Sequence, residues 1–164
     1  MRAVMDAVER EIAAAVAGRP LDADLIVLSL RYLRDFPEWF HHPREEALFA
    51  LAIRKDPSRE AALAPVMAEH DAQPASNERL LDAFEALAED GGQPPDDTLT
   101  ELRRYIEDQR RHMQRENEEI FPVLLAVLDE ADWTFEALDI ADPLHGTRDP
   151  GAFRPLLDRI AVRR

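Results

Sequence analysis

The residues most able to do chemistry in this chain are its histidines, of which the sequence contains five. Two of them begin a His-x-x-x-Glu pattern, His41 with Glu45 and His112 with Glu116, and His70 lies between these pairs. On a helix, residues four apart share one face with Cβ atoms about 6 Å apart, so each pair can reach one metal ion. A single pair is usually a solvated ion pair, but two pairs and a further histidine together favour a metal site.

The spacing of apolar residues predicts that His70 and His112 point into a helical core. Positions spaced alternately four and three residues apart form a mostly apolar stripe around His70. The corresponding stripe around His112 is apolar at its ends and polar in its middle. Ionisable groups that point into a bundle are costly unless they are paired or bound to a metal, so this polar middle indicates a buried site. The second stripe consists of Leu102, Tyr105, Gln109, His112, Glu116, Val123 and Val127.

In the segment with two neighbouring histidines, the sequence leaves a choice between His41 with Glu45 and His42 with Glu46. At about 100° per residue, the mean direction of the apolar side chains lies nearer His41 and Glu45. We therefore expect His42 and Glu46 to point further round the helix, towards solvent or against a ligand. The other register stays open, because prolines in this segment disturb the calculation.

The donor atoms narrow the choice of metal. Histidine and carboxylate donors suit iron, manganese or zinc, and the chain contains no cysteine. Five candidate ligands exceed what one tetrahedral zinc ion uses, and glutamate can bridge two ions, so we expect two metals. The candidate ligands are His41, Glu45, His70, His112 and Glu116, and the residues expected to contact or replace them are His42, Glu46, Glu119 and Tyr105.

The elements that must position these residues are helices, because the apolar pattern is helical throughout and strand-like alternation is absent. Four long helices with short loops make an up-down-up-down four-helix bundle the simplest architecture, so we predict an all-α fold. We expect residues 1–130 to form the bundle and residues 131–164 to form a short C-terminal helical appendage on the same domain. The long helices are predicted over residues 2–17, 22–54, 56–88 and 98–128. The appendage is predicted to contain a short helix near 132–138, a turn-rich stretch over 142–151 and a last helix from about 150.

Prolines and capping residues predict where these helices begin or become irregular. Pro37 and Pro43 predict kinks in the second helix, and Pro65 and Pro74 predict interruptions in the third. Thr98, with a glutamate three residues later, predicts a capping box at the start of the fourth.

Composition limits the classes of function. The chain has 164 residues, of which 46% are hydrophobic and 33% charged, as in a globular protein. Its formal net charge of −14 argues against nucleic-acid and membrane partners. The absence of cysteine excludes disulfides, iron–sulfur clusters and cysteine nucleophiles. No apolar run is long enough for a membrane span, and acidic residues interrupt the N-terminal stretch, so we expect a cytoplasmic protein.

The segments HHPREEALF, AEH and HMQRENEEIFP closely resemble the motifs of the hemerythrin-like HHE cation-binding family. Their order and spacing, with the DW and DPL-x-G tail, are similar to bacterial members, so the resemblance covers nearly the whole chain. It implies a hemerythrin-like four-helix bundle around a non-haem centre of two irons, oxo- or hydroxo-bridged. By that resemblance, His41, His70 and His112 would be terminal ligands, and Glu45 and Glu116 would bridge the irons.

The chain departs from the family pattern at two positions. Oxygen-carrying members have a second histidine four residues after the ligand of the third helix, and here that position is Pro74. The family also places a histidine on the first helix, commonly as His-x-x-Met-Arg, and residues 2–17 contain none. Met1 and Arg2 match the end of that pattern, so the ligand is either lost or lies three residues before Met1. We therefore expect one iron to be held more weakly and the two positions to be unequally occupied.

These features predict a di-iron protein that binds or senses O2, NO, peroxide or iron, with a small diatomic ligand or peroxide as its partner. Two other classes stay open, a di-iron redox enzyme that turns over peroxide or oxygen and a metal-free helical interaction module. Multiple turnovers in stopped-flow oxidation would separate the enzyme from the binding protein, and metal analysis would separate the module. The sequence favours binding over catalysis and indicates no particular protein partner.

Overall fold

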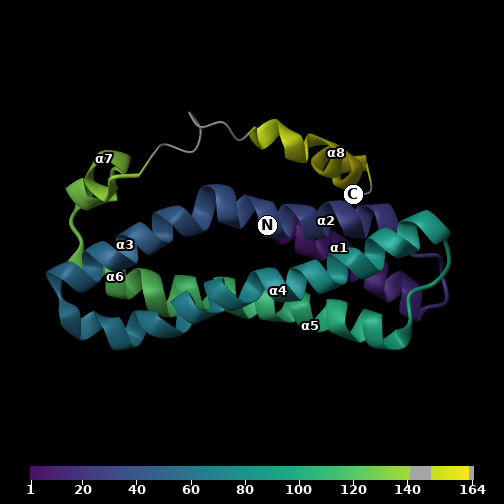
Figure 1. The fold of residues 1–164 in the computed structure, drawn as a ribbon, viewed down its shortest axis with the longest axis horizontal. Helices are drawn as coiled ribbons and strands as arrows, with labels where there is room; N and C mark the ends of the chain where they lie inside the picture. Colours follow the sequence, from purple (N-terminus) through teal and green to yellow (C-terminus); the bar gives the residue numbers. More distant parts are fainter. Residues whose placement is uncertain (141–148, 163–164) are drawn as a thin grey trace. The chain divides into compact units, whose positions relative to one another are not determined.

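The structure is a computed structural model that describes residues 1–140 and 149–162. Every regular element in these residues is a helix and none is a strand, which confirms the predicted all-α, helical-bundle class (Figure 1). Residues 142–148 of the predicted turn-rich stretch lie outside the described residues. None of the described helices is both long and apolar enough to span a membrane. The predicted division of the chain at residue 130 stays a prediction.

The chain forms two compact units, which are described separately. Unit 1 consists of Met1–Asp35, Pro74–Gln109 and Pro150–Arg164, and unit 2 consists of Phe36–Gln73 and Arg110–Asp149. Unit 1 contains α1 (Arg2–Val16), most of α2 (Ala23–Phe36), the second part of α4 (Glu60–Asp90), most of α5 (Asp96–Arg115), η6 (Pro150–Phe153) and α8 (Arg154–Val162). Unit 2 contains η1 (Pro37–His41), α3 (His42–Lys55), η2 (Pro57–Arg59), the first part of α4, the end of α5, η3 (Glu116–Ile120), α6 (Phe121–Val127), η4 (Glu130–Trp133) and α7 (Phe135–Leu138).

The C-terminal part of unit 1, η6 and α8, contacts the rest of the unit through an arginine and an aromatic ring. Arg159 donates two hydrogen bonds of 2.8 Å to the two carboxylate oxygens of Asp22. The ring of Phe153 meets the ring of Tyr32 edge to face at 5.1 Å. The two-pronged geometry of arginine with a carboxylate fixes orientation, so these contacts hold α8 in unit 1.

A buried hydrogen bond lies at the centre of unit 1. The side-chain amide of Asn77, which is 1% exposed, donates to the hydroxyl of Tyr105 at 2.8 Å and to the carbonyl of Leu30 at 3.1 Å. Burial raises the pKa of Tyr105 to about 12. The hydroxyl therefore stays protonated and neutral at physiological pH.

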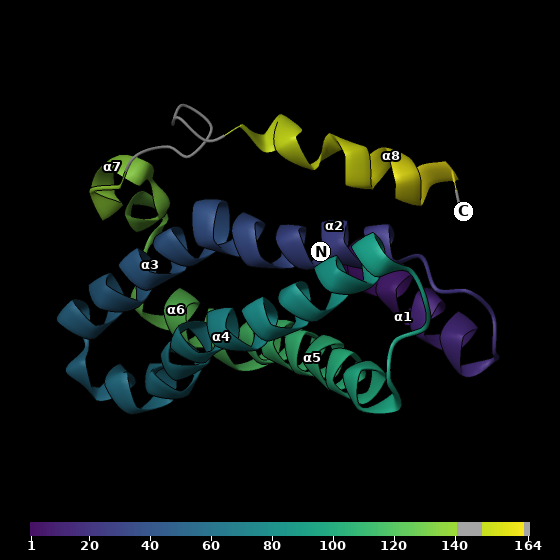
Figure 2. The same cartoon turned by 45° about the vertical axis from the view of Figure 1, so that its right-hand side comes forward.

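Unit 2 has an apolar cluster that joins its two chain segments. In this unit α3 and α6 lie side by side, as Figure 1 and Figure 2 both show. Lys55, the last residue of α3, forms ion pairs with Asp129 and Asp132, which follow α6 in the sequence. The buried members of the cluster are Leu48, Phe49, Ala52, Leu63, Val66, Ile120, Leu124, Leu128 and Leu138.

Two π-helical turns, η1 and η3, are the main irregularities of unit 2. The N–H of His42 donates to the carbonyl of Pro37, and the N–H of Phe121 donates to the carbonyl of Glu116, so each bond spans five residues. In both cases the next residue is a proline, which has no N–H and clashes with the carbonyl four residues earlier. The helix therefore widens by one residue just before each proline.

Each π-turn shifts the buried face by one residue. After η3 the buried side chains include Leu124 and Leu128, whereas unbroken α-helical spacing predicted Val123 and Val127. The two valines are only partly buried. Because a π-turn takes up one more residue than an α-turn, each later residue lies where α-helical spacing places the one before it.

Two predictions about the ends and interruptions of helices are wrong. α4 runs unbroken through Pro65 and Pro74. Each proline removes only one hydrogen bond, and the other hydrogen bonds of this helix of 31 residues keep it continuous. α5 begins two residues before Thr98, so this residue lies inside the first turn rather than at the N-cap. Glu101, the other member of the predicted capping box, instead faces Arg79 at 3.4 Å.

Replacing Tyr105 with phenylalanine tests the buried hydrogen bond of unit 1. The Tyr105→Phe variant leaves the buried Asn77 amide without one acceptor, and we expect the free energy of unfolding to fall by about 1–2 kcal/mol. Thr98→Ala is the control and should cost less than about 0.5 kcal/mol, since Thr98 caps no helix. Urea unfolding measures both changes. A neutral Tyr105→Phe variant would contradict the assigned role of the hydroxyl.

Candidate metal centre

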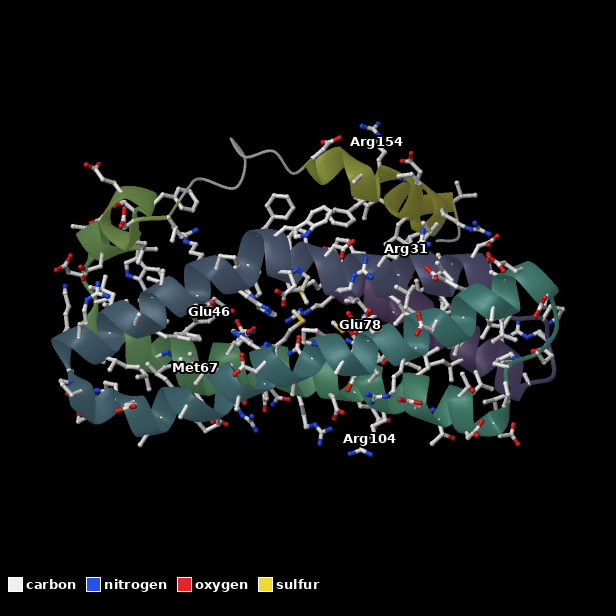
Figure 3. All side chains as sticks on the ribbon, viewed as in Figure 1. Arg31, Glu46, Met67, Glu78, Arg104 and Arg154 are labelled. Carbon is white, nitrogen blue, oxygen red and sulfur yellow. The ribbon has the colours of Figure 1, made fainter. Side chains whose placement is uncertain are left out.

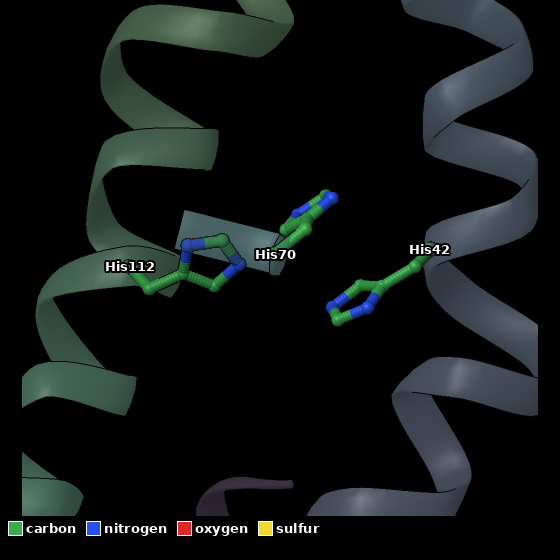
Figure 4. Close-up of side chains that lie close together, drawn as sticks. All are labelled: His42, His70 and His112. Atoms are coloured by element: carbon green, nitrogen blue, oxygen red, sulfur yellow. The ribbon is translucent and has the colours of Figure 1, made fainter. Parts of the chain in front are cut away.

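Three histidines from three helices meet inside unit 2. His42 begins α3, His70 lies in α4 and His112 lies near the end of α5, and Figure 4 shows their side chains facing one another. One nitrogen of each ring lies within 4.8 Å of those of the other two. The rings of His42 and His70 are stacked, with centroids 3.9 Å apart and planes 15° apart. Imidazole nitrogens gathered in this way are donors that suit iron, manganese or zinc.

A second group of donors adjoins these histidines. Donor atoms of His41, Glu45 and Glu116 also lie within 4.8 Å of one another. His70 Nε2 lies 3.6 Å from Glu45 Oε2 and 3.9 Å from Glu116 Oε1. His112 Nε2 lies 2.8 Å from Glu116 Oε1. Both carboxylates therefore lie between histidines of the two groups.

These donor groups are buried with too few hydrogen bonds. Glu45 and Glu116 are each 3% exposed, whereas a charged side chain such as Arg104 points away from the ribbon (Figure 3). Both Glu45 oxygens, both His70 ring nitrogens, Nε2 of His112 and Oε1 of Glu116 have no hydrogen-bond partner among the described residues. Each such atom costs about 1–3 kcal/mol, and more when it is charged. A metal ion would take these atoms as ligands, so the residues present fit a metal centre.

Burial and crowding shift the pKa values of the site. Burial and the neighbouring imidazoles lower the pKa of His42 to about 3, which keeps its ring neutral. Burial raises the pKa of Glu45 to about 7, although His41 acts in the opposite direction. Burial also favours a raised pKa for Glu116, but its contacts with His112 and the other imidazoles outweigh burial and lower the pKa well below its usual range. Without metal, Glu116 is therefore ionised at neutral pH, where Glu45 is only partly ionised.

Of the two positions expected for His42, towards solvent or against a ligand, the structure shows the second, with the ring buried against His70. His42 is 4% exposed, whereas the side chain of His41 is 32% exposed. The prediction assumed a uniform rotation of 100° per residue, and the π-turn η1 adds one residue directly before His42. Both histidines consequently reach the site, His41 beside the carboxylates and His42 against the ring of His70.

The other candidates from the sequence lie at the edge of this cluster or elsewhere. Glu46 is exposed, with Oε1 4.0 Å from Nδ1 of His70. Glu119 was expected near the stripe of His112 but is exposed, because η3 shifts the buried face by one residue. Tyr105 belongs to unit 1, where its hydroxyl accepts the hydrogen bond from Asn77.

Two glutamates that the sequence reasoning missed contact the outer ring nitrogens. Oε2 of Glu69 lies 2.8 Å from Nδ1 of His112, and Oε1 of Glu38 lies 3.1 Å from Nδ1 of His42. The spacing of four residues between Glu38 and His42 is a helical signal that could have identified this pair. Glu69 and His112 lie 43 residues apart on different helices, so sequence spacing gives no such signal for them.

The comparisons with known proteins agree with this geometry. The family model of the hemerythrin HHE cation-binding domain matches residues 1–124, which include all three histidine-bearing segments and confirm the resemblance. No curated protein and no solved structure matched the chain. The matched residues are well over half of the 164 in the chain. The protein therefore belongs to the hemerythrin HHE cation-binding domain family.

Proposed function

We propose that this protein holds two irons without haem and uses them to bind or sense a small ligand such as O2, NO or peroxide. The observation that carries the proposal is the set of buried donor atoms that lack hydrogen bonds in unit 2. Carboxylates and imidazoles are tolerated in such a place when they are paired or bound to a metal. The donor set contains no sulfur, which suits iron better than copper(I).

In this proposal His41, His70 and His112 are terminal ligands, and Glu45 and Glu116 bridge the two irons. Each carboxylate lies within 4 Å of more than one imidazole, which supports bridging: His41 Nε2 is 3.4 Å from Glu45 and 3.6 Å from Glu116. Five protein ligands are also too few to fill two six-coordinate ions. Positions therefore stay free for water or for a small ligand.

His42 has a different part in the proposal. The rings of His42 and His70 are nearly parallel, with centroids 3.9 Å apart. Rings stacked in this way would not both hold the same ion. His42 is instead a neutral ring that stacks on His70 and holds it in place.

When bound, the irons supply exchangeable coordination positions and two oxidation states. The surroundings come from the residues of unit 2. The ring of Phe49, which is fully buried, stacks on His70 at 6.1 Å and excludes water from that side. His41 is the most exposed of the five ligands, so we expect small molecules to enter beside it.

The iron content of the purified protein tests this function. Protein from iron-supplemented cells should contain more than one but fewer than two irons per chain, because α1 supplies no histidine. It should also show the near-ultraviolet absorption of oxo-bridged ferric iron. The Glu45→Gln/Glu116→Gln variant should lose iron, whereas Glu118→Gln, an exposed glutamate bonded to Gln114, should retain it. Zinc in place of iron, or no metal at all, would contradict the proposal.

Substitutions at the neighbouring histidines test the assignment of ligands. We expect His41→Ala and Glu45→Ala to lower iron affinity by more than about 100-fold, since each removes a ligand. His42→Phe, which keeps a ring against His70, and Glu46→Ala should lower it by less. Competition with a chelator measures the affinities. If His42→Phe releases iron while His41→Ala retains it, the ligand in this segment is His42.

A further inference from the structure

One strong contact in unit 2 has no part in the donor set proposed above. Glu69, in α4, places Oε2 2.8 Å from Nδ1 of His112, in α5. The other oxygen of Glu69 pairs with Arg115, three residues after the histidine. The opposite ring nitrogen of His112, Nε2, faces Glu116 at 2.8 Å. The imidazole thus has a carboxylate on its outer side and the candidate metal centre on its inner side.

We propose that Glu69, anchored by Arg115, is the positioning residue of His112 and fixes the ring proton on Nδ1. A carboxylate accepts a hydrogen bond but has none to donate, and of the two ring nitrogens only Nδ1 makes a hydrogen bond, because Nε2 lies close to Glu116 without a hydrogen-bond partner among the described residues. The proton is therefore assigned to Nδ1. Nε2 is then unprotonated and directed at the centre, as a metal ligand must be. For its effect on metal binding this inference rests on the proposed function, whereas the position of the proton is a property of the metal-free protein.

Arg115 is needed because the Glu69 side chain is partly exposed to solvent. His112 is 5% exposed, but the side chains of Glu69 and Arg115 are 36% and 35% exposed. Because the Glu69 side chain is partly exposed, it can also adopt rotamers in which its carboxylate points into solvent, away from His112. The charge-assisted pair with Arg115 selects the rotamer that contacts Nδ1. Arg115 therefore acts on His112 through Glu69.

The negative charge of Glu69 also makes His112 a stronger metal ligand. A carboxylate on the outer nitrogen raises the basicity of the inner nitrogen, and losing such a partner typically lowers metal affinity about 10–100-fold. Glu38 makes the corresponding contact with His42, at 3.1 Å, but His42 is not one of the proposed ligands. Glu38 therefore provides a matched control.

The first measurement is long-range proton–nitrogen NMR of the histidine rings in metal-free protein, with the signals of His112 identified from the His112→Gln variant. In wild type, and in Glu69→Gln, which keeps an oxygen acceptor, the proton should be on Nδ1. In Glu69→Ala this preference should disappear. A proton on Nε2 in wild type, or an unchanged preference in Glu69→Ala, would overturn the proposal, whether or not the protein binds iron.

The second measurement is Fe(II) affinity by chelator competition in wild type, Glu69→Ala, Arg115→Ala and the double variant. Glu69→Ala should lower affinity about 10–100-fold, and Arg115→Ala should add nothing in the Glu69→Ala background. Glu38→Gln should bind like wild type. The proposal would be contradicted if Glu69→Ala bound Fe(II) as tightly as wild type. It would also be contradicted if Arg115→Ala lowered the affinity as much in the Glu69→Ala variant as in wild type. Either result would show that Glu69 and Arg115 only join the two helices. A wild type that binds no Fe(II) would refute the proposed function, and the proton position would still decide the role of Glu69.

Discussion

The burial of two carboxylates among imidazoles is the constraint on which the rest of unit 2 depends. Glu45 and Glu116 are almost fully buried, and the ring nitrogens beside them include those of His70 and Nε2 of His112, which lack hydrogen bonds among the described residues. The apolar cluster that contains Phe49 supplies no polar group to these atoms. Such a site is stable when a cation neutralises the carboxylates and accepts the free electron pairs of the rings. Membership of a cation-binding family agrees with this physical requirement.

Two prolines determine where the donor atoms lie. Each removes a helical hydrogen bond and widens the turn before it, and the two wide turns contain residues of the site at their ends. His41 is the last residue of η1, and Glu116 is the first residue of η3. Widened turns of this kind are frequent at functional sites, because they change the direction of a side chain without ending the helix. Here the extra residue in η1 allows two consecutive histidines to reach one cluster.

The same turns explain how far the site could be predicted from the sequence. The spacing of four and three residues correctly indicated that His70, His112 and Glu116 are buried, because that spacing holds as far as η3. It failed for Val123 and Val127, which follow η3 and are only partly buried, while Leu124 and Leu128 take the buried positions. The X-Pro pairs at 42–43 and 121–122 mark both turns in the sequence, but they do not indicate by how many residues the register shifts. The contact between Glu69 and His112 joins two helices, so no local pattern predicts it.

Unfolding in urea with and without iron tests most directly whether a metal compensates for the buried donors. Iron should raise the free energy of unfolding of the wild type, because only the folded chain brings the ligands together. In Glu45→Leu, iron should have no such effect, and the metal-free variant should be at least as stable as the metal-free wild type, since an unpaired buried carboxyl group has been removed. Equal stability of the wild type with and without iron would contradict the account, as would a Glu45→Leu variant that is less stable than the wild type when both are metal-free.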